Sequence, residues 1–312
     1  MARTRPTRRS MTLVAALVAL AAMVHAGPAA AAPATPLFGG ILATVPIEVN
    51  GSYVPLPTYC DGDIDVVWYG VGAAPDARWL GLNLAPPTVE FSRVAMSVSG
   101  TYRPFVGDFD GDGCEDIFWY SPGAAPDYVW YLAPDDSYTT VAVSVSGNYV
   151  PVVGHFSAGP AQDIYWYAPG SGAESIWTGN VGRSFTPSIA PQVNGTYSPF
   201  VFSDSTVIWY APGAAQDYVT YPLAGSATPS GSDQTTINGT YRPFSLGGTP
   251  VLYAPGVGTD RLVTSIDGGG PVVTVQTLPG SINGDYVVGA SGTVGLGVLH
   301  VPGPGQDLLL VS

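Results

Sequence analysis

The sequence predicts an all-β chain folded as a six-bladed β-propeller, and three observations lead to this prediction. Each repeat holds four short segments rich in β-branched and aromatic residues. The two ends of the chain carry complementary fragments of one further repeat. A five-residue tag (Val or Ile, then Asn or Ser, Gly, any residue and Tyr) also recurs six times, beginning at Val49, Val98, Val145, Val193, Ile237 and Ile282.

The spacing of the tags indicates a repeat architecture. Their first residues are 44 to 49 positions apart, a period typical of propeller blades that copy one four-stranded unit around a ring. No stretch after residue 32 shows helical periodicity of useful length. A seven-bladed propeller and a β-solenoid are the alternatives, although solenoid rungs are usually shorter and lack tight hairpins.

The second repeat shows the four strands most clearly. A turn at Pro122–Pro126 and a polar loop at Ala133–Tyr138 separate the later strands, since Pro and Gly favour turn conformations. The expected strands are Tyr102–Phe109, Asp116–Ser121, Asp127–Leu132 and Thr139–Val145.

The ends of the chain predict how the ring closes. Ile41–Val49 is a fourth strand with no blade before it, and Asp307–Ser312 is a third strand with no fourth after it. We expect the N-terminal strand to complete the sixth blade, because closure removes the exposed strand edges that invite aggregation.

Residues 1–32 have the order of a secretory signal peptide and its processing region. Four arginines precede the apolar run Met11–Val24, which is followed by small residues. The run is short for a permanent bilayer span. Cleavage after Ala26 and cleavage near Ala31 both fit. We therefore expect export, by the general secretory route rather than the twin-arginine route, and a single propeller domain over residues 33–312 in an extracellular protein.

The charge of the exported chain excludes some partners. Ten basic residues less the four arginines of the leader leave six, against 23 acidic residues, so the net charge changes from −13 to −17. Such a surface repels phosphate backbones and anionic lipids. We expect no nucleic-acid partner and no membrane insertion, but a monomer that meets an extracellular glycan or protein.

One loop of the second repeat has the pattern of a metal site. The sequence DFDGDGCED places carboxylates at alternate positions of a tight turn that two glycines permit, and Ca²⁺ takes several such oxygens together with a backbone carbonyl. Mg²⁺ fits less well because it prefers a stricter octahedron. An acidic turn without an ion is the alternative, but crowded carboxylates would repel one another. The expected ligands are Asp108, Asp110, Asp112, the carbonyl of Cys114, and Asp116.

The equivalent loops of the other repeats are less complete. The first repeat keeps three acidic residues, which form a weak or empty second site: Asp61, Asp63 and Asp65. In the third repeat His155 replaces the first ligand and only Asp163 remains. We therefore expect calcium to stiffen a loop rather than to take part in chemistry.

The segment Gly107–Tyr120 (GDFDGDGCEDIFWY) resembles the FG-GAP, or VCBS-type, repeat of integrin α-chain propellers and of many secreted bacterial proteins. The resemblance implies six or seven blades and a calcium ion on the loop between the first two strands of a blade. The metal motif is intact in only one copy. Such propellers serve as adhesion modules, lectin-like binders and accessory domains of enzymes, so the resemblance does not name a function.

The two cysteines predict a disulfide between neighbouring repeats. Cys60 and Cys114 lie in corresponding loops of the first and second repeats, and an even number of cysteines in an exported chain favours a bridge. Two free, buried thiols are the alternative.

Two further sets of residues have both a structural and a ligand-binding interpretation. Tryptophan pairs spaced 11 residues apart could stack on sugars, although packing between blades is favoured: Trp68 and Trp79, Trp119 and Trp130, Trp166 and Trp177. An acidic residue also follows the second-strand turn of every repeat, where it could grip a ligand or, as we favour, cap its own turn: Asp76, Asp127, Glu174, Asp217, Asp260 and Asp307.

The sequence shows no recognisable catalytic constellation. His155 and His300 are the histidines outside the leader, and the position of His300 on a strand favours a packed residue over a base. The leading hypothesis is a calcium-binding propeller that acts as a binding or adhesion module, with carbohydrate as the favoured ligand. A polysaccharide-active lyase or hydrolase and a purely structural scaffold for proteins are the alternatives.

Overall fold

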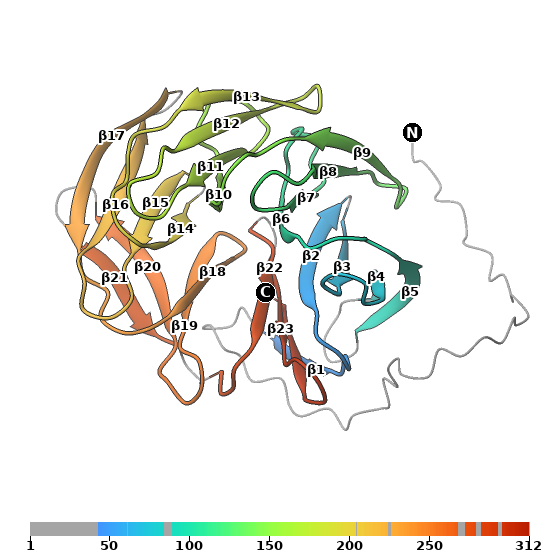
Figure 1. Cartoon of the computed structure of the whole chain (residues 1–312). Helices are drawn as coiled ribbons and strands as arrows, with labels where there is room; N and C mark the ends of the chain where they lie inside the picture. The colour runs from blue at the N-terminus through green and yellow to red at the C-terminus, as the bar shows by residue number, and fades with distance from the viewer. Residues whose placement is uncertain are drawn as a thin grey trace, which may run out of the picture.

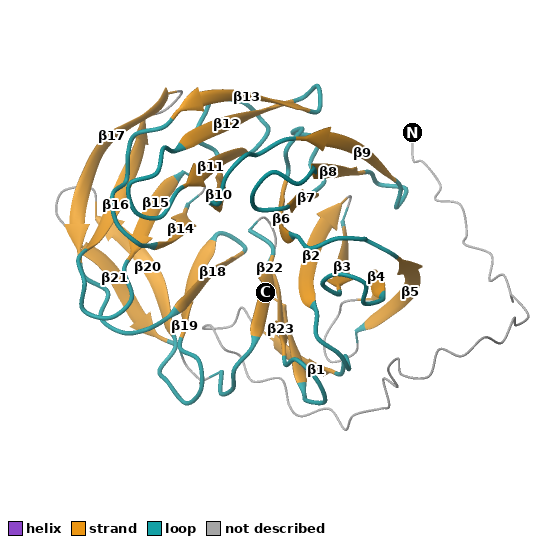
Figure 2. Ribbon diagram, viewed as in Figure 1, coloured by secondary structure: helices purple, strands orange, loops and turns teal. Residues whose placement is uncertain are grey.

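A computed structural model of the chain describes residues 43–60, 62–83, 89–203, 205–223, 226–267, 272–278, 282–292 and 295–311. Within these ranges all of the long regular elements are β-strands (Figure 2). The described residues contain no helix with the length and apolar character needed to cross a bilayer. The predicted signal peptide, Ile41 and Asp61 lie outside the described residues.

The strands form six separate four-stranded antiparallel sheets, arranged as blades around a common centre (Figure 1). Blade 1 contains β2 (Val54–Cys60), β3 (Asp63–Tyr69), β4 (Asp76–Asn83) and β5 (Glu90–Met96); blade 2 contains β6 (Arg103–Gly107), β7 (Asp116–Tyr120), β8 (Asp127–Leu132) and β9 (Tyr138–Val143). Blade 3 contains β10 (Val150–Gly154), β11 (Asp163–Tyr167), β12 (Ser175–Asn180) and β13 (Ser184–Ile189); blade 4 contains β14 (Ser198–Phe202), β15 (Thr206–Tyr210), β16 (Asp217–Leu223) and β17 (Ser226–Thr235). Blade 5 contains β18 (Arg242–Leu246), β19 (Thr249–Tyr253), β20 (Arg261–Asp267) and β21 (Val272–Thr277).

Blade 6 is built from both ends of the chain. It contains β22 (Val287–Ala290), β23 (Leu296–His300), β24 (Asp307–Val311) and the N-terminal β1 (Ala43–Ile47). Strand β1 pairs antiparallel with β24, from Ala43 opposite Val311 to Ile47 opposite Asp307. This pairing confirms the predicted ring closure and the count of six blades, and it rules out the seven-bladed and solenoid alternatives.

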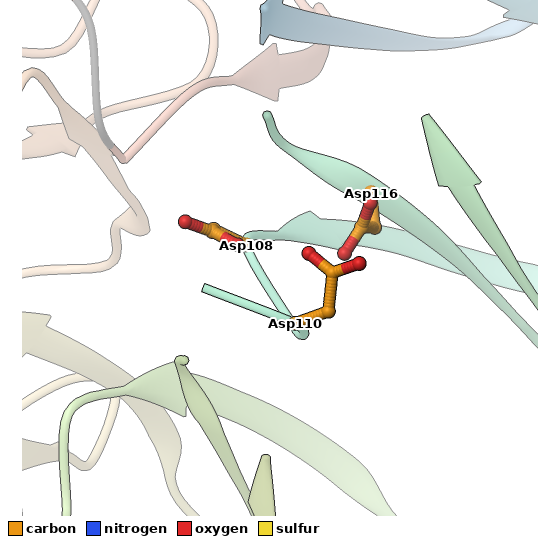
Figure 3. Close-up of side chains that lie close together, drawn as sticks. All are labelled: Asp108, Asp110 and Asp116. Atoms are coloured by element: carbon orange, nitrogen blue, oxygen red, sulfur yellow. The ribbon is translucent and has the colours of Figure 1, made fainter. Parts of the chain in front are cut away.

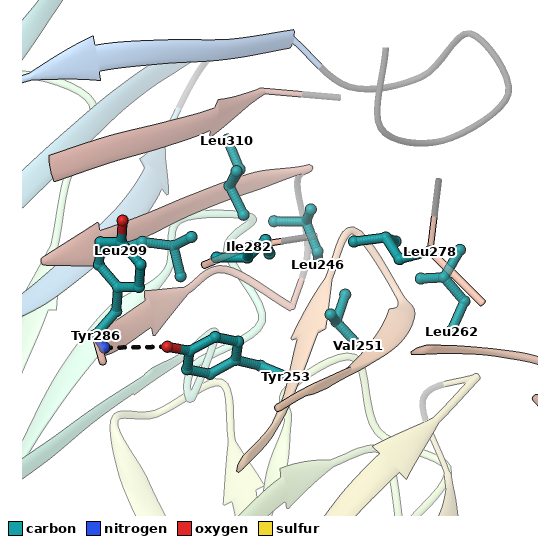
Figure 4. Packing of buried hydrophobic residues seen from close by; sticks show 9 residues of the cluster. All are labelled: Leu246, Val251, Tyr253, Leu262, Leu278, Ile282, Tyr286, Leu299 and Leu310. Carbon is teal, nitrogen blue, oxygen red and sulfur yellow. Dashed lines mark hydrogen bonds between the residues drawn. The ribbon is translucent and has the colours of Figure 1, made fainter. Parts of the chain in front are cut away.

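The hydrophobic core lies between neighbouring blades. The first strand of each blade is innermost and the last is outermost (Figure 1), so the second strand has a blade on both sides and is almost completely buried. Between blades 5 and 6, Val251 and Tyr253 of β19 pack with Leu299 of β23 and Leu310 of β24 (Figure 4). The apolar runs of the second strands are therefore explained by burial on both faces.

The recurring tag joins each blade to the next. At the first junction, Gly72 in the β3–β4 hairpin forms an isolated antiparallel bridge with Gly100 of the second tag. The hydroxyl of Tyr69 donates to the carbonyl oxygen of Gly100 at 2.8 Å and accepts from the backbone N–H of Tyr102 at 2.9 Å. Four later tyrosines repeat both bonds at their own junctions: Tyr120, Tyr167, Tyr210 and Tyr253.

The glycine of the tag is required by its backbone and its neighbour. Gly100 has a φ of +135°, a region that L-residues rarely adopt, and a Cβ atom there would lie 2.7 Å from the ring of Tyr102. The tag thus combines a backbone position open only to glycine with the tyrosine that covers it.

The acidic residue after each second-strand turn completes the same junction. Asp76 accepts hydrogen bonds from the backbone N–H groups of Gly70 at 2.7 Å and Val98 at 2.6 Å. Asp127 likewise accepts from Ser121 and Val145 at 2.7 Å each. Both carboxylates are buried. These two carboxylates therefore cap the backbone of the junction, as favoured from the sequence, and are not exposed for ligand binding.

His300 takes the place of the junction tyrosine where blade 6 meets blade 1. Its Nε2 accepts from the backbone N–H of Tyr53 at 3.3 Å, and its Nδ1 lies 3.0 Å from Asp307 Oδ1. The side chain is fully buried, as expected for a packed strand residue.

Three predicted strands of blade 2 are too long. The segment expected at Asp116–Ser121 ends as β7 at Tyr120, because the backbone N–H of Ser121 is bonded to Asp127. The segment expected at Tyr102–Phe109 ends as β6 at Gly107, because Tyr102 belongs to the junction and Asp108 begins the acidic loop. The segment expected at Thr139–Val145 is β9, Tyr138–Val143, because the backbone of Val145 is bonded to Asp127. The third strand, Asp127–Leu132, is confirmed.

Candidate metal centre

Three carboxylates of the loop between β6 and β7 converge. Asp108, Asp110 and Asp116 each offer an oxygen within 4.8 Å of the others, a spacing that could hold a metal ion (Figure 3). Asp112 is exposed and does not join them. Instead its Oδ1 accepts the backbone N–H of Cys114 at 2.9 Å, which is a turn-capping role.

The local sequence explains why the loop turns this tightly. Asp108 accepts the backbone N–H groups of Gly111 at 2.7 Å and Gly113 at 3.0 Å, and both glycines have positive φ. A Cβ atom on Gly111 would lie 2.9 Å from the backbone nitrogen of Ala161 in blade 3. The spacing of the acids therefore depends on residues without side chains.

The three carboxylates are costly in their ionised form. Burial, followed by the charges of nearby acids, raises the pKa of Asp108 above its ordinary value despite hydrogen bonds from Gly113 and Gly111. Burial also raises the pKa of Asp110, against the opposing effect of Arg183. For Asp116, which is fully buried, burial raises the pKa to about 9. A cation would relieve this cost by favouring the ionised forms.

Two buried polar atoms near the cluster lack a hydrogen-bond partner. One is Asp110 Oδ1, although the other oxygen of this carboxylate is paired. The second is the hydroxyl of Tyr131 on β8, whose pKa is raised first by burial and then by the charges of Asp116 and Asp110. Buried polar groups are normally satisfied, and a cation at this point would give Asp110 Oδ1 a partner. The residues present therefore fit a cation site.

Contacts with neighbouring blades hold the loop in place. Toward blade 3, the backbone N–H of Asp108 donates to Gln162 Oε1 at 2.9 Å, and the N–H of Gln162 donates to the carbonyl of Asp108 at 2.6 Å. Toward blade 1, the predicted disulfide Cys60–Cys114 is present.

The loop also reaches blade 6 through a residue that sequence reasoning missed. Glu115 is buried and accepts from the backbone N–H of Tyr59 at 3.0 Å and from the hydroxyl of Ser291 at 2.8 Å. Ser291 follows 176 positions later in the chain, so no local pattern could have paired the two. One loop thereby contacts blades 1, 3 and 6.

A second missed residue is Arg183, which enters from the β12–β13 hairpin of blade 3. Its Nε donates to Asp110 Oδ2 at 2.9 Å. The sequence offered one signal that Arg183 could matter, which is the scarcity of basic residues: the chain has six arginines and no lysine after residue 32. Their acidic partners follow only from the fold.

The acidic loop of the first repeat has a different arrangement. Asp65 occupies the place of Asp116, since each accepts the backbone N–H of the residue 16 positions later. The guanidinium of Arg78 bonds Asp65 Oδ2 through Nε at 3.1 Å and Nη2 at 2.7 Å. Asp61 lies outside the described residues, and the structure describes only the backbone of Asp63. The carboxylate of Asp65 already has a cationic partner within the chain.

Four of the predicted sugar-stacking tryptophans are buried between blades. Three lie on second strands, and Trp119 for example contacts Tyr69 of blade 1 at a ring-centroid distance of 5.2 Å. The buried members are Trp68, Trp79, Trp119 and Trp166. Trp130 and Trp177 are half-buried. The packing interpretation therefore accounts for most of these rings.

Comparison with protein-family models and with curated proteins adds no relative. No protein-family model matches the chain, and no curated protein matches it.

Proposed function

We propose that the chain is an exported calcium-binding propeller of the FG-GAP type that acts as a binding module. The observation that carries this proposal is the unpartnered, buried Asp110 Oδ1 beside the Asp108 and Asp116 carboxylates. Ca²⁺ suits the site because it accepts several oxygen ligands in a flexible geometry, including carboxylates and carbonyls. Asp108, Asp110 and Asp116 would hold the ion, with the carbonyl of Cys114 as a further donor.

The ion would act on the shape of the ring rather than on a substrate. The loop is tied to blade 1 by a disulfide, to blade 3 by Gln162 and to blade 6 by Glu115. A cation that fixes the loop would therefore restrain four of the six blades at once, which suits a rigid scaffold for binding.

Isothermal titration of chelator-treated protein with Ca²⁺ tests the metal site. We expect binding by the parent and its loss in Asp110→Ala. Asp285→Ala is the matched control, because it removes an exposed carboxylate at the junction of blades 5 and 6 that pairs with Arg242 at the surface. Equal heats in the parent and Asp110→Ala would contradict the assignment.

Carbohydrate remains the favoured ligand because of one exposed aromatic pair. Tyr138 on β9 stacks on Trp130 with ring centroids 4.3 Å apart and planes 19° apart, and Tyr138 is 48% exposed. Trp130 in turn contacts Trp119 at 4.9 Å, so the pair is anchored in the core. A rigid exposed ring is a surface on which a sugar ring can stack, with polar side chains nearby on the same hairpin.

A glycan array tests this part of the proposal. We expect binding that is lost in Tyr138→Ala and retained in Ile189→Ala, which removes an even more exposed apolar side chain without removing a ring. Uniformly negative arrays would remove the carbohydrate version and favour the protein scaffold. Release of reducing ends from a bound polysaccharide would favour the lyase or hydrolase alternative.

A further inference from the structure

Arg183 reaches the candidate metal centre from another blade. The β12–β13 hairpin of blade 3 carries it across the junction to blade 2, where its Nε lies 2.9 Å from Asp110 Oδ2. The guanidinium also lies over the ring of Tyr131, 5.4 Å from its centroid. Asp110 is almost fully buried while the Arg183 side chain is 36% exposed. The arginine therefore bonds one oxygen of Asp110, while the other oxygen, Oδ1, has no hydrogen-bond partner.

The backbone conformation of the β12–β13 hairpin fixes the position of Arg183. Arg183 has a φ of 58°, which is uncommon for a residue with a side chain, and its N–H closes the turn onto the carbonyl of Asn180 at 3.0 Å. Gly182 precedes Arg183, and a turn shifted by one residue would have placed this glycine, which adopts positive φ readily, at the same position. A residue held in a sparsely populated conformation is a reason to ask what its side chain does there.

The converging side chains carry charges that match a divalent ion. Three ionised carboxylates contribute three negative charges and Arg183 contributes one positive charge, which leaves two negative charges, and the exposed Asp112 acts on them from outside the cluster. In blade 1 an arginine also bonds an acidic loop, and it makes two hydrogen bonds where Arg183 makes one: Arg78 bonds Asp65 through two nitrogen atoms. Only six arginines follow residue 32, and two of them are placed against equivalent acidic loops.

We propose that Arg183 sets the affinity and the charge selectivity of the metal centre. It holds Asp110 through Oδ2, so that Oδ1 is available to an ion, and its positive charge matches the site to a divalent rather than a trivalent cation. This inference rests on the metal site proposed above.

The substitution Arg183→Gln separates charge from position, because glutamine retains an N–H donor without the charge. At a separation of about 6 Å and near-aqueous screening, a guanidinium repels a divalent ion by an amount that corresponds to about tenfold in affinity. Coulomb energy is proportional to the charge of the ion, so a trivalent ion gains about thirtyfold. We expect Arg183→Gln to bind Ca²⁺ about tenfold more tightly and to raise the ratio of Tb³⁺ to Ca²⁺ affinity about threefold.

Two variants control this experiment. Arg183→Lys keeps the charge, so the Tb³⁺ to Ca²⁺ ratio should stay at the parent value even if both affinities change. Arg103→Gln removes a positive charge from blade 2 at a site where the arginine bonds Asn148 at the surface, and it should leave both affinities unchanged. Calorimetric titration with each ion, after circular dichroism has confirmed folding, supplies the measurements.

The outcomes distinguish the inference from the site itself. An unchanged ratio in Arg183→Gln, with Ca²⁺ bound by the parent, overturns the role of Arg183 and leaves the calcium site intact. Binding by Arg183→Gln but not by the parent supports the role and shows that the arginine closes the native site. If neither protein binds Ca²⁺ or Tb³⁺, the metal site and the inference both fail.

Discussion

The acidic loops of blades 1 and 2 show two ways to compensate the same buried carboxylate. In blade 1, Asp65 is neutralised by Arg78, which also bonds the carbonyl of Asp136 in blade 2. In blade 2, the equivalent Asp116 has no basic partner among the contacts described and instead lies beside two further acids. The comparison teaches that acidic loops of similar content differ in which carboxylate the neighbouring arginine binds: Arg78 bonds Asp65 itself, whereas Arg183 bonds Asp110 and leaves Asp116 beside other acids.

Removing the disulfide between the two loops is expected to have the largest effect. Cys60–Cys114 spans 54 residues, for which loop-closure entropy corresponds to about 4 kcal/mol in the free energy of unfolding. We expect that loss in the double variant Cys60→Ala/Cys114→Ala, measured by guanidinium denaturation in chelator. Reduction of the parent should reproduce the loss. A change below about 1 kcal/mol would show that the blades hold the loops together unaided.

Breaking the blade 1 ion pair should reduce stability without changing metal binding. Asp65→Asn leaves the mostly buried Arg78 without the carboxylate that two of its nitrogen atoms bond, although the Asp136 carboxylate remains 3.7 Å away. We expect a loss of about 2 kcal/mol, below the usual cost of breaking a buried pair because this second acid remains. Urea denaturation measures the loss, and titration should show the parent affinity for Ca²⁺. Reduced Ca²⁺ binding would mean that the two loops do not differ as described.

The blade 2 loop should make the metal-free protein less stable as pH rises. The folded pKa of Asp116 is about 9, above its unfolded value, so between about pH 4 and pH 9 the native state binds more protons than the unfolded state. Stability is then lost with rising pH, by on the order of 1 kcal/mol per unit at most. Denaturation in chelator at pH 5 to 8 measures this slope.

Two controls accompany the pH experiment: the same denaturation series at high salt and the same series with Ca²⁺ in place of chelator. High salt screens repulsion between surface carboxylates but not the effect of burial on Asp116. Ca²⁺ should reduce the slope, because the ion favours the ionised carboxylates. The prediction fails if the slope vanishes in high salt, or if it is the same with and without Ca²⁺.

Local patterns were sufficient for the parts of the site that lie within one repeat. The acids and glycines of the β6–β7 loop predicted a turn with converging carboxylates, and Asp108, Asp110 and Asp116 do converge. Asp112 was expected with them because it shares their alternate spacing. In the folded loop its carboxylate is used by the backbone of Cys114 instead, a choice that depends on turn geometry and not on spacing.

The interactions between blades could not be predicted from local sequence patterns. Arg183 is 73 positions from Asp110, and Ser291 is 176 positions from Glu115. Such pairs meet only in the folded ring, which places blade 3 next to blade 2 and brings Ser291 of blade 6 to the blade 2 loop. For the tryptophan pairs, packing between blades was the favoured interpretation, and a neighbouring blade does cover the second-strand rings.

The sequence by itself determined the strand order, the six blades and the closure of the ring. At five junctions a tag glycine, the hydroxyl of a second-strand tyrosine and an acidic side chain satisfy backbone groups of neighbouring repeats, and His300 replaces the tyrosine where blade 6 meets blade 1. Only the tertiary structure decided which acidic loop brings three carboxylates close enough to hold a cation. That outcome depends on where a few arginine side chains end after the blades pack, and electrostatic energy follows distance in space rather than distance along the chain.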